Sequence, residues 1–415
     1  MSIPTINQLN EKYSIRNGIA QTIVLNGSNN YFILFAISVL GASNYQVGLI
    51  NSLPQFIGMF GMLVGSVIMN KLPEKRKFTA YSFLFTRLFL LGMFFVVFIP
   101  REYSGWVFVL LVGFMNLPGS FANLSWQAFI GDLVPEKRRS GFFSQRNMML
   151  TLVGMVVTFI IGIGLQFFSK TNPIPYQFLF LLTFIAGIFE VYYLLKHVES
   201  KKSNLAMKKS VKVGMVAFKD KRFVYFLICG LCFNFTWQMA WALFSIFQIK
   251  YAHATGFWIS VITVANQIGQ IVSYKWWGRM ADKYGNAKMM IPVSLGMAAA
   301  PVLTILSKNM VYLTIINGLS GLFVSGTVLL LFNLLLEVTN KDNRDSFISQ
   351  YNILLAIVGF IAPQFGVLLL EQASMSFAMI TSTLLRISSG GLFIFLSIYL
   401  TKKPKNFHKI TIKSS

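Results

Sequence analysis

Residues that perform most enzyme chemistry are scarce in this sequence. Its 415 residues include 2 cysteines, 3 histidines and 13 acidic residues. A catalytic or metal site needs such side chains gathered in one place, yet His197, His253 and His408 fall in predicted loops or the tail, where we expect solvated surface histidines. Cys229 and Cys232 have no histidine or acid nearby in sequence, which favours packing over a redox or metal pair. We therefore predict no catalytic residues, no metal and no cofactor.

Charge of either sign is also sparse. Charged residues make up 12% of the chain and hydrophobic residues 55%, with a mean hydropathy of +0.63. A soluble protein of this length could not cover its surface with so little polar material. Apolar runs close to the ~20 residues that cross a bilayer as a helix recur along the chain. They predict an all-α polytopic membrane protein with twelve transmembrane helices, near residues 17–41, 45–70, 79–99, 106–131, 141–167, 176–195, 222–250, 256–276, 289–307, 310–337, 346–371 and 375–401.

The positive charges are unevenly placed. The formal net charge is +23, and most of the 36 Lys and Arg residues fall before the first predicted span, in alternate loops and in the tail. The other loops hold only Arg101, Lys170, Lys250 and Lys308. This imbalance follows the positive-inside rule. We expect a multi-pass protein of the cell membrane with both termini in the cytoplasm, no nucleic-acid partner, and a first span retained because residues 1–16 lack the features of a secretory signal.

A polar stretch at 196–221 separates six predicted spans from six. We predict an N-terminal six-helix bundle over 1–195, a cytoplasmic linker over 196–221, a C-terminal six-helix bundle over 222–401 and a cytoplasmic tail over 402–415. The linker composition also allows a short amphipathic helix on the membrane surface.

The two predicted halves carry a sequence repeat. DLVPEKRRSGFFSQRN at 132–147 aligns with EVTNKDNRDSFISQYN at 337–352, so each copy begins with an acid, Asp132 or Glu337, and places Arg139 opposite Arg344. Two six-span halves in the same orientation imply parallel repeats that face each other across a central cavity. We therefore expect alternating access.

A second motif lies between the eighth and ninth predicted spans. WWGRMADKYGNAKMM resembles the loop between the second and third spans of each half in the major facilitator superfamily, through Gly278, Arg279, Asp282, Lys283 and Gly285. The first-half counterpart, SVIMNKLPEKRK, departs from the family pattern, with Asn where the family usually has Asp and Pro where it has Gly. The resemblance implies the fold of that family and a charge latch in which Asp282 stabilises one conformation at the cytoplasmic mouth. The alternative is that these charges only enforce orientation and a tight turn.

Amide and indole side chains inside the predicted spans are candidate substrate contacts. Several share one helix face through i, i+3 and i+4 spacing, and in the resembled fold spans one, four, seven and ten line the cavity. Amides that only join helix to helix are the alternative. The candidates are Asn26, Asn30, Asn123, Gln127, Asn234, Trp237, Gln238, Trp241, Asn266, Gln270 and Asn317.

Few ionisable residues lie within the predicted spans. Arg87 and Arg386 lie well inside, whereas Glu190 and Glu337 lie nearer span ends. The arginines could attract an anionic substrate, pair with helix carbonyls or snorkel. Proton coupling through Glu190 or Glu337 has little support, and facilitated diffusion, sodium coupling and anion exchange stay open.

The pattern as a whole predicts secondary active or facilitative transport of a small organic solute. The 41 Phe and 19 Met slightly favour efflux of amphipathic compounds over a sugar- or nucleoside-type uptake carrier. The alternatives from other classes are a non-transporting membrane sensor and a membrane-embedded transferase. No GxxxxGK[ST] loop supports ATP drive. We expect a monomer whose partners are a small-molecule substrate, the lipid bilayer and a coupling ion of unidentified type.

Overall fold

The computed structural model describes residues 6–69, 75–133, 136–198, 218, 220–339 and 344–402. Within these residues the chain is helical, with short turns and no strand. The first six passes are built from α1 (Ile6–Ser28) continued by η1 (Asn29–Tyr31) and α2 (Phe32–Ser38), α3 (Asn44–Met69), α4 (Lys75–Phe95) with η2 (Val96–Phe98), α5 (Arg101–Phe114) with α6 (Asn116–Leu133), α7 (Glu136–Gln166) and α8 (Ile174–Leu195).

The second six passes follow the same order. They are α9 (Lys221–Ile246) with the π-helical turn η5 (Phe247–Tyr251), α10 (Gly256–Tyr284), α11 (Asn286–Ile305), α12 (Met310–Val338), α13 (Arg344–Gln372) and α14 (Met375–Lys402). α9 begins at Lys221 because the Asp220 carboxylate accepts a hydrogen bond from the Arg222 amide and so caps the helix.

Ten of these passes are long and apolar enough, among the described residues, to cross a membrane on length and composition alone. The other two are the pass formed by α1 and α2 and the pass formed by α10. Both carry several amides, such as Asn26 and Asn30 in the first and Asn266 and Gln270 in the second. The prediction of an all-α membrane protein built from two parallel six-helix repeats is confirmed. Both of the less apolar passes carry candidate site residues.

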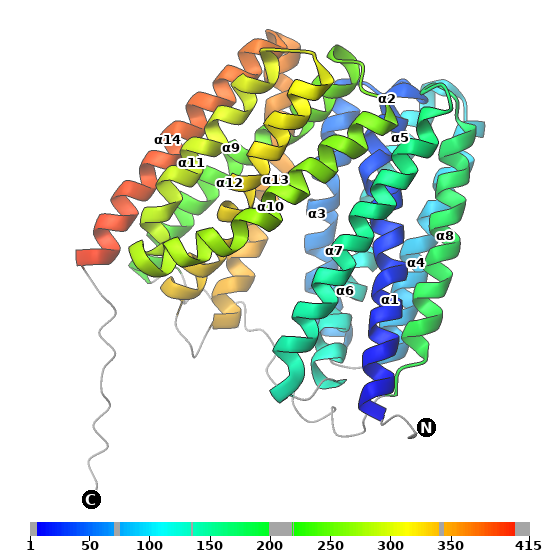
Figure 1. The fold of residues 1–415 in the computed structure, drawn as a ribbon, viewed down its shortest axis with the longest axis horizontal. Helices are drawn as coiled ribbons and strands as arrows, with labels where there is room; N and C mark the ends of the chain where they lie inside the picture. Colours follow the sequence, from blue (N-terminus) through cyan, green and yellow to red (C-terminus); the bar gives the residue numbers. More distant parts are fainter. Residues whose placement is uncertain are drawn as a thin grey trace, which may run out of the picture.

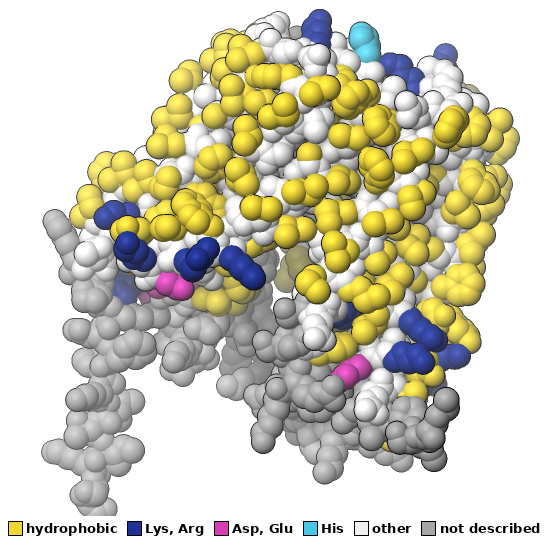
Figure 2. Space-filling model, viewed as in Figure 1, with side chains coloured by type: hydrophobic (Ala, Val, Ile, Leu, Met, Phe, Trp, Pro, Cys, Tyr) yellow, Lys and Arg dark blue, Asp and Glu magenta, His cyan; other side chains and the backbone are white. Residues whose placement is uncertain are grey.

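Large apolar side chains cover the sides of the molecule (Figure 2). Phe98, Phe167 and Phe395 are each more than 70% exposed. A soluble protein would not expose so much apolar surface to water, whereas apolar side chains that face lipid tails carry little free-energy cost. The multi-pass membrane arrangement therefore explains the exterior as well as the helix lengths.

The helices form two bundles, α1–α8 and α9–α14, with both termini at the same end (Figure 1). The bundles meet at the opposite end and diverge toward the termini, where the surface is notched between them (Figure 2). Helix packing across the divide pairs α3 with α13 and α7 with α10. The predicted domain boundaries stay a prediction, because residues 199–217 of the linker and 403–415 of the tail lie outside the described residues.

Polar contacts join the bundles at the end away from the termini. The Tyr31 hydroxyl lies 2.7 Å from the Ser260 hydroxyl. Asn44, at the start of α3, donates from its amide to a Glu371 carboxylate oxygen at 2.6 Å and accepts from the Lys250 ammonium at 2.7 Å. These bonds link η1 and α3 of the first bundle to α10, η5 and α13 of the second.

Apolar packing reinforces this closure. One continuous core contains Phe35 and Phe108 of the first bundle and Leu243 and Val367 of the second, each at most 1% exposed. Side chains that pack to this extent exclude water and hold the two bundles together. The central space therefore has a sealed end and an end that opens toward the termini.

One sequence expectation is wrong at the end of α8. His197 was expected to be a solvated surface residue, but it is 1% exposed. Its Nδ1 lies 3.0 Å from the Leu194 carbonyl oxygen and its ring meets Tyr13 edge-on, with centroids 6.1 Å apart. Burial lowers the pKa of this imidazole to about 4, although the neighbouring carbonyls act in the opposite direction. A loop position did not imply exposure, because the N-terminal turns of α1 fold against it.

Candidate functional site

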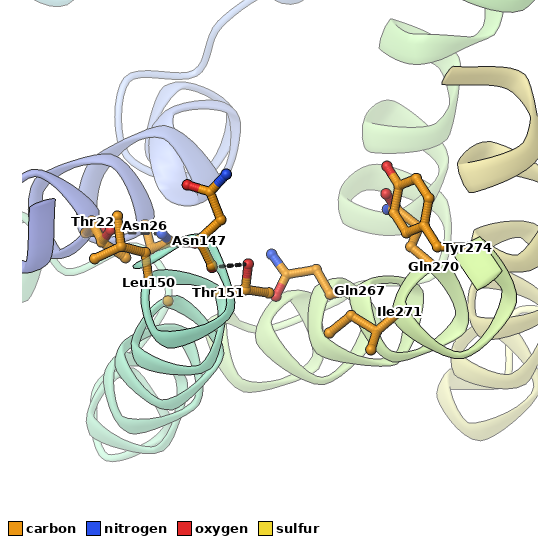
Figure 3. A pocket seen from close by; sticks show the side chains of 10 residues that line it. Thr22, Asn26, Asn147, Leu150, Thr151, Gln267, Gln270, Ile271 and Tyr274 are labelled. Carbon is orange, nitrogen blue, oxygen red and sulfur yellow. Dashed lines mark hydrogen bonds between the residues drawn. The ribbon is translucent and has the colours of Figure 1, made fainter. Parts of the chain in front are cut away.

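A cavity of about 490 Å³ lies between the two bundles (Figure 3). α1 and α7 form one wall and α10 forms the other. Most of its lining side chains are amides or hydroxyls, and the lining residues are Thr22, Asn26, Asn147, Leu150, Thr151, Gly154, Gln267, Gln270, Ile271 and Tyr274. Its volume falls within the ~300–1,000 Å³ typical of small-molecule sites. We call it the central cavity.

The central cavity offers unsatisfied hydrogen-bonding capacity. The Gln267 Oε1 atom is buried and has no hydrogen-bond partner among the described residues. A buried acceptor in this condition costs free energy unless water or a ligand donates to it. Across the cavity, the Asn26 amide donates to the Thr22 carbonyl oxygen at 3.0 Å. The lining therefore suits a solute that carries hydroxyl or N–H groups.

A second cavity, of about 210 Å³, lies inside the C-terminal bundle. Trp237 and Trp241 form part of its wall, with ring centroids 5.7 Å apart in an edge-to-face arrangement. Asn266, Asn317 and Arg386 add polar groups. We call it the Arg386 cavity. Four of the predicted contacts thus lie together, although they come from α9, α10 and α12.

A hydrogen-bonded chain joins the two cavities through α10. Gln270, in the central cavity, donates to Asn266 Oδ1 at 2.8 Å, and Asn266 donates to the Asn317 carbonyl oxygen at 2.9 Å. A ligand that displaces Gln270 would therefore also disturb the wall of the Arg386 cavity.

Other predicted contacts lie elsewhere. Asn30 donates to the Thr158 hydroxyl at 3.2 Å, and Asn234 donates to the Tyr351 hydroxyl at 3.2 Å, so both join helices within one bundle. The Gln238 side chain accepts from Gln55 at 3.1 Å and joins the bundles to each other. Asn123 and Gln127 are exposed on α6, away from both cavities. As substrate contacts, these five stay predictions.

The candidate set omitted most of the polar residues that line the central cavity. Thr22, Asn147, Thr151, Gln267 and Tyr274 line it but are not among the predicted contacts. Gln267 stood beside two chosen amides, so its spacing on α10 offered a signal. The residues of α7 gave no comparable signal, because the sequence did not indicate that this pass lines a cavity. Whether α7 residues reach the cavity depends on how α7 packs against α10.

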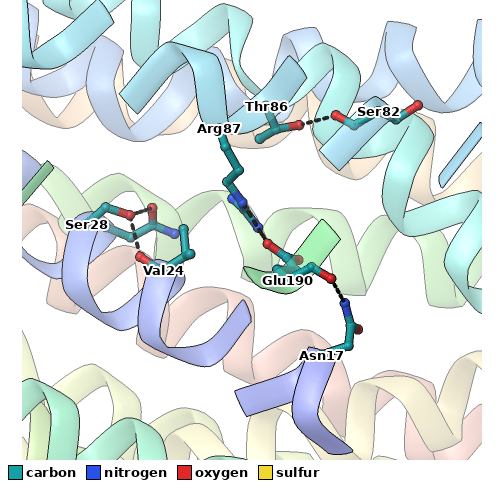
Figure 4. Close-up of polar contacts among 8 residues, drawn as sticks. Asn17, Val24, Ser28, Ser82, Thr86, Arg87 and Glu190 are labelled. Atoms are coloured by element: carbon teal, nitrogen blue, oxygen red, sulfur yellow. Dashed lines mark hydrogen bonds and ion pairs between the residues drawn. The ribbon is translucent and has the colours of Figure 1, made fainter. Parts of the chain in front are cut away.

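The N-terminal bundle buries an ion pair away from both cavities (Figure 4). Arg87 of α4 donates from Nε and Nη2 to Glu190 Oε2 of α8, at 2.9 and 2.8 Å, and the two side chains are 2% and 0% exposed. Asn17 of α1 donates to the Glu190 carbonyl oxygen at 2.8 Å. The pair joins α4 to α8, and the Asn17 bond adds α1. Glu190 lies deeper than its place near a predicted span end indicated.

The sequence profile of the Major Facilitator Superfamily matches residues 18–260 and, again, 226–413. The chain belongs to the Major Facilitator Superfamily. Membership makes it a transporter rather than an enzyme, as predicted. The two overlapping matches agree with the repeat, since each begins in a different bundle.

Solved structures of the family share the fold. The nucleoside transporter NupG superposes with a TM-score of 0.70 at 12% identity and covers 96% of this chain and 99% of its own. A D-xylose-proton symporter gives 0.67 at 12% identity, covering 92% and 96%. A POT family transporter in complex with 5-aminolevulinic acid gives 0.68 at 14% identity, covering 94% and 96%. A search of curated proteins found no match.

The family loop motif forms the turn between α10 and α11. Gly285 adopts φ +89° and ψ +147°, a conformation available essentially to glycine alone, which explains why this residue type stands there. Gly278, about two helical turns before Gly285, faces α12 near Leu329. Glu337 at the end of α12 accepts from Asn286 at 3.1 Å and ties this turn to its own bundle.

The proposed latch charges are not engaged across the bundles. Arg279, Asp282 and Lys283 are exposed, and among the described residues Asp282 forms no ion pair. Arg279 Nε donates to the Lys275 carbonyl oxygen at 3.4 Å. The side chains of Asp132, Arg139 and Arg344, the other predicted gate residues, lie outside the described part of the chain. The role of these charges as a latch stays a prediction.

Proposed function

We propose that this family member carries a small polar organic solute by alternating access, with the solute bound in the central cavity. The orphaned Gln267 Oε1, in a cavity lined mainly by amides and hydroxyls from both bundles, is the observation that carries this proposal. A solute held by both walls would change its affinity as the bundles rock, and such differential binding is what shifts a conformational equilibrium. Asn26 and Gln270 are the predicted contacts that this site uses.

The membrane orientation forms part of the same proposal. The excess of Lys and Arg on the side of the termini supports a cytoplasmic placement in the cell membrane. With the termini inside, the structure corresponds to an inward-open state, and the contacts of Asn44 with Lys250 and Glu371 seal the outer end.

Labelling of intact cells tests the orientation. In a Cys229→Ser, Cys232→Ser background, a membrane-impermeant maleimide should label Lys308→Cys in intact cells and Arg279→Cys only after permeabilisation. The reverse pattern would invert the topology and with it the assignment of the outer end.

Melting temperatures in detergent test the site. Xylose, uridine, amino acids and lipophilic cations form the panel, since a ligand that binds only the folded state raises the melting temperature by mass action. We expect shifts from polar compounds that are lost in Asn26→Ala and Gln270→Ala. Gln372→Ala is the matched control, because this amide is exposed at the end of α13 and lines neither cavity, and its shift should equal that of the wild type.

Efflux of amphipathic compounds remains the second candidate, supported by the many Phe and Met residues. The polar lining of the central cavity favours transport of a small polar solute over efflux. Shifts from several unrelated lipophilic cations, with none from sugars, nucleosides or amino acids, would reverse that preference. Flux in proteoliposomes then establishes transport, and binding without flux would support a sensor.

A further inference from the structure

Arg386 is a buried cation with no carboxylate partner among the described residues. It is 0% exposed, and its three nitrogens donate to main-chain carbonyls: Nε to Thr236 at 3.2 Å, Nη1 to Met297 at 2.6 Å and Nη2 to Trp237 at 2.9 Å. Its guanidinium also lies 5.8 Å from the centre of the Phe244 ring. Carbonyls and a ring face hold the group in place, but they supply only partial negative charge.

Arg386 has more N–H donors than the three carbonyls use. A guanidinium carries five N–H groups, and the three carbonyls use one from each nitrogen. By this count one N–H on Nη1 and one on Nη2 are not used by the carbonyls, and guanidinium N–H groups bind carboxylates strongly, often two at a time. Arg386 lines the cavity of about 210 Å³ that lies beside it.

The walls of this cavity decide which kind of anion fits. Trp237, Trp241 and Phe244 present aromatic surface, and Asn266 and Asn317 contribute amides. A small inorganic ion would leave aromatic surface uncovered and would lose most of its hydration shell. An organic group attached to a carboxylate would cover the rings while the carboxylate meets the guanidinium. The volume lies below the range of drug-sized sites, which limits the group to a small one.

We propose that the Arg386 cavity binds the carboxylate of a small organic acid and so makes the transported solute an anion. This proposal rests on the proposed transport function, and the hydrogen-bonded pair Gln270 and Asn266 links the walls of the two cavities. A buried charge without a counter-charge is costly in a membrane, and a carboxylate supplied by the solute would compensate it. Arg386 then recognises the substrate class, while the central cavity binds the polar remainder of the solute.

Matched acids and amides test the charge requirement. Lactate, benzoate and indole-3-acetate are compared with lactamide, benzamide and indole-3-acetamide for binding to the purified full-length protein by calorimetry. We expect at least one acid to bind about tenfold or more tightly than its amide, with the preference abolished in Arg386→Gln. Arg279→Gln is the control, because that arginine is exposed outside the cavity, and it should keep the preference.

Two further variants test the proposal if Arg386→Gln does not fold. Arg386→Lys keeps the charge but loses the paired donors, so it should weaken acid binding while leaving the amides unchanged. Trp241→Ala should weaken benzoate and indole-3-acetate more than lactate. Equal binding of acids and amides in the wild type, or acid preference that survives in both Arg386 variants, would overturn the proposal, as would chloride or phosphate binding more tightly than every acid.

The outcomes also separate this proposal from the proposed function. Uptake of xylose or uridine into proteoliposomes, abolished by Gln270→Ala, with no binding of any acid, would leave the transport proposal standing and overturn the anion site. Acid binding that depends on Arg386, with no flux of that acid, would support the site and contradict transport through it.

Discussion

Arg87 of the N-terminal bundle and Arg386 of the C-terminal bundle are both buried, but they are held by different groups. Arg87 of α4 meets the Glu190 carboxylate of α8, whereas Arg386 of α14 meets only carbonyl oxygens, one of them on Met297 of α11. The helix pairs are equivalent in the repeat, because α4 and α8 form the third and sixth passes and α11 and α14 form the ninth and twelfth. The acid is present in one pair and missing from the other.

The difference separates a structural charge from an available one. A buried ion pair satisfies its own charges, and Arg87 lines neither of the two cavities. Arg386 lines a cavity and has N–H donors beyond those that the three carbonyls use. In a repeated fold, one half can therefore hold its buried arginine in an ion pair, while the corresponding helix pair of the other half has an arginine that a ligand carboxylate can neutralise.

Removal of the carboxylate from the Arg87–Glu190 ion pair should lower the stability of the protein more than any other change proposed here. Glu190→Gln leaves Arg87 buried without a counter-charge, and we expect a loss of about 3–5 kcal/mol in the free energy of unfolding. The melting temperature in detergent measures it. Glu102→Gln, at an exposed position of α5, should change it little. A Glu190→Gln protein as stable as the wild type would show that the pair is not structural.

Addition of an acid to the C-terminal pair should make the two bundles alike. Met297→Glu places a carboxylate beside Arg386 in the cavity, so it should be about 1.5–3 kcal/mol more stable than its control Met297→Gln. The same change should weaken benzoate binding at least about tenfold. Calorimetry and thermal melts measure the two effects. Benzoate binding equal in both variants would contradict the view of Arg386 as an available charge.

Removal of the C-terminal arginine should cost less than removal of the N-terminal acid. Arg386→Met frees three carbonyl acceptors but also removes a buried charge, so we expect a net loss of at most about 2 kcal/mol. Chemical or thermal unfolding in detergent compares it with Glu190→Gln. A larger loss of stability in Arg386→Met than in Glu190→Gln would contradict the proposed difference between the two buried arginines.

A buried base that can lose its proton should behave differently from both arginines. The pKa of His197 is about 4 in the fold and 6.5 ordinarily, so the fold favours the neutral imidazole. The stability that the fold gains from the neutral imidazole is complete above pH 6.5. It is lost as the pH falls toward 4, because the unfolded chain takes up the proton at a higher pH than the folded chain does. The wild type should therefore lose more stability between pH 7 and pH 5 than His197→Gln.

Melting temperatures at these two pH values measure the His197 effect. His253→Asn is the control, since His253 is exposed in a loop and its positive φ of 58° suits asparagine. An equal loss of stability in the wild type and in His197→Gln would show that this histidine does not titrate with unfolding.

Much of the fold was accessible from the chain alone. Apolar runs of membrane-spanning length, the repeat and the loop motif around Asp282 predicted twelve helices and the family. These signals are local, since hydrophobic length and turn chemistry are properties of short segments. The site was only partly accessible: Asn26 and Gln270 reached the central cavity, but Asn234 and Gln238 became helix contacts.

The sequence by itself determined what kind of protein this is, because the cost of exposing polar backbone or burying charge in lipid leaves few alternatives for such a chain. Only the tertiary structure decided which polar groups serve a ligand. Arg87 and Arg386 look alike as single cations within apolar helices. One faces Glu190, 103 residues away along the chain, and the other faces a cavity, since helix packing rather than local sequence sets what lies opposite a side chain.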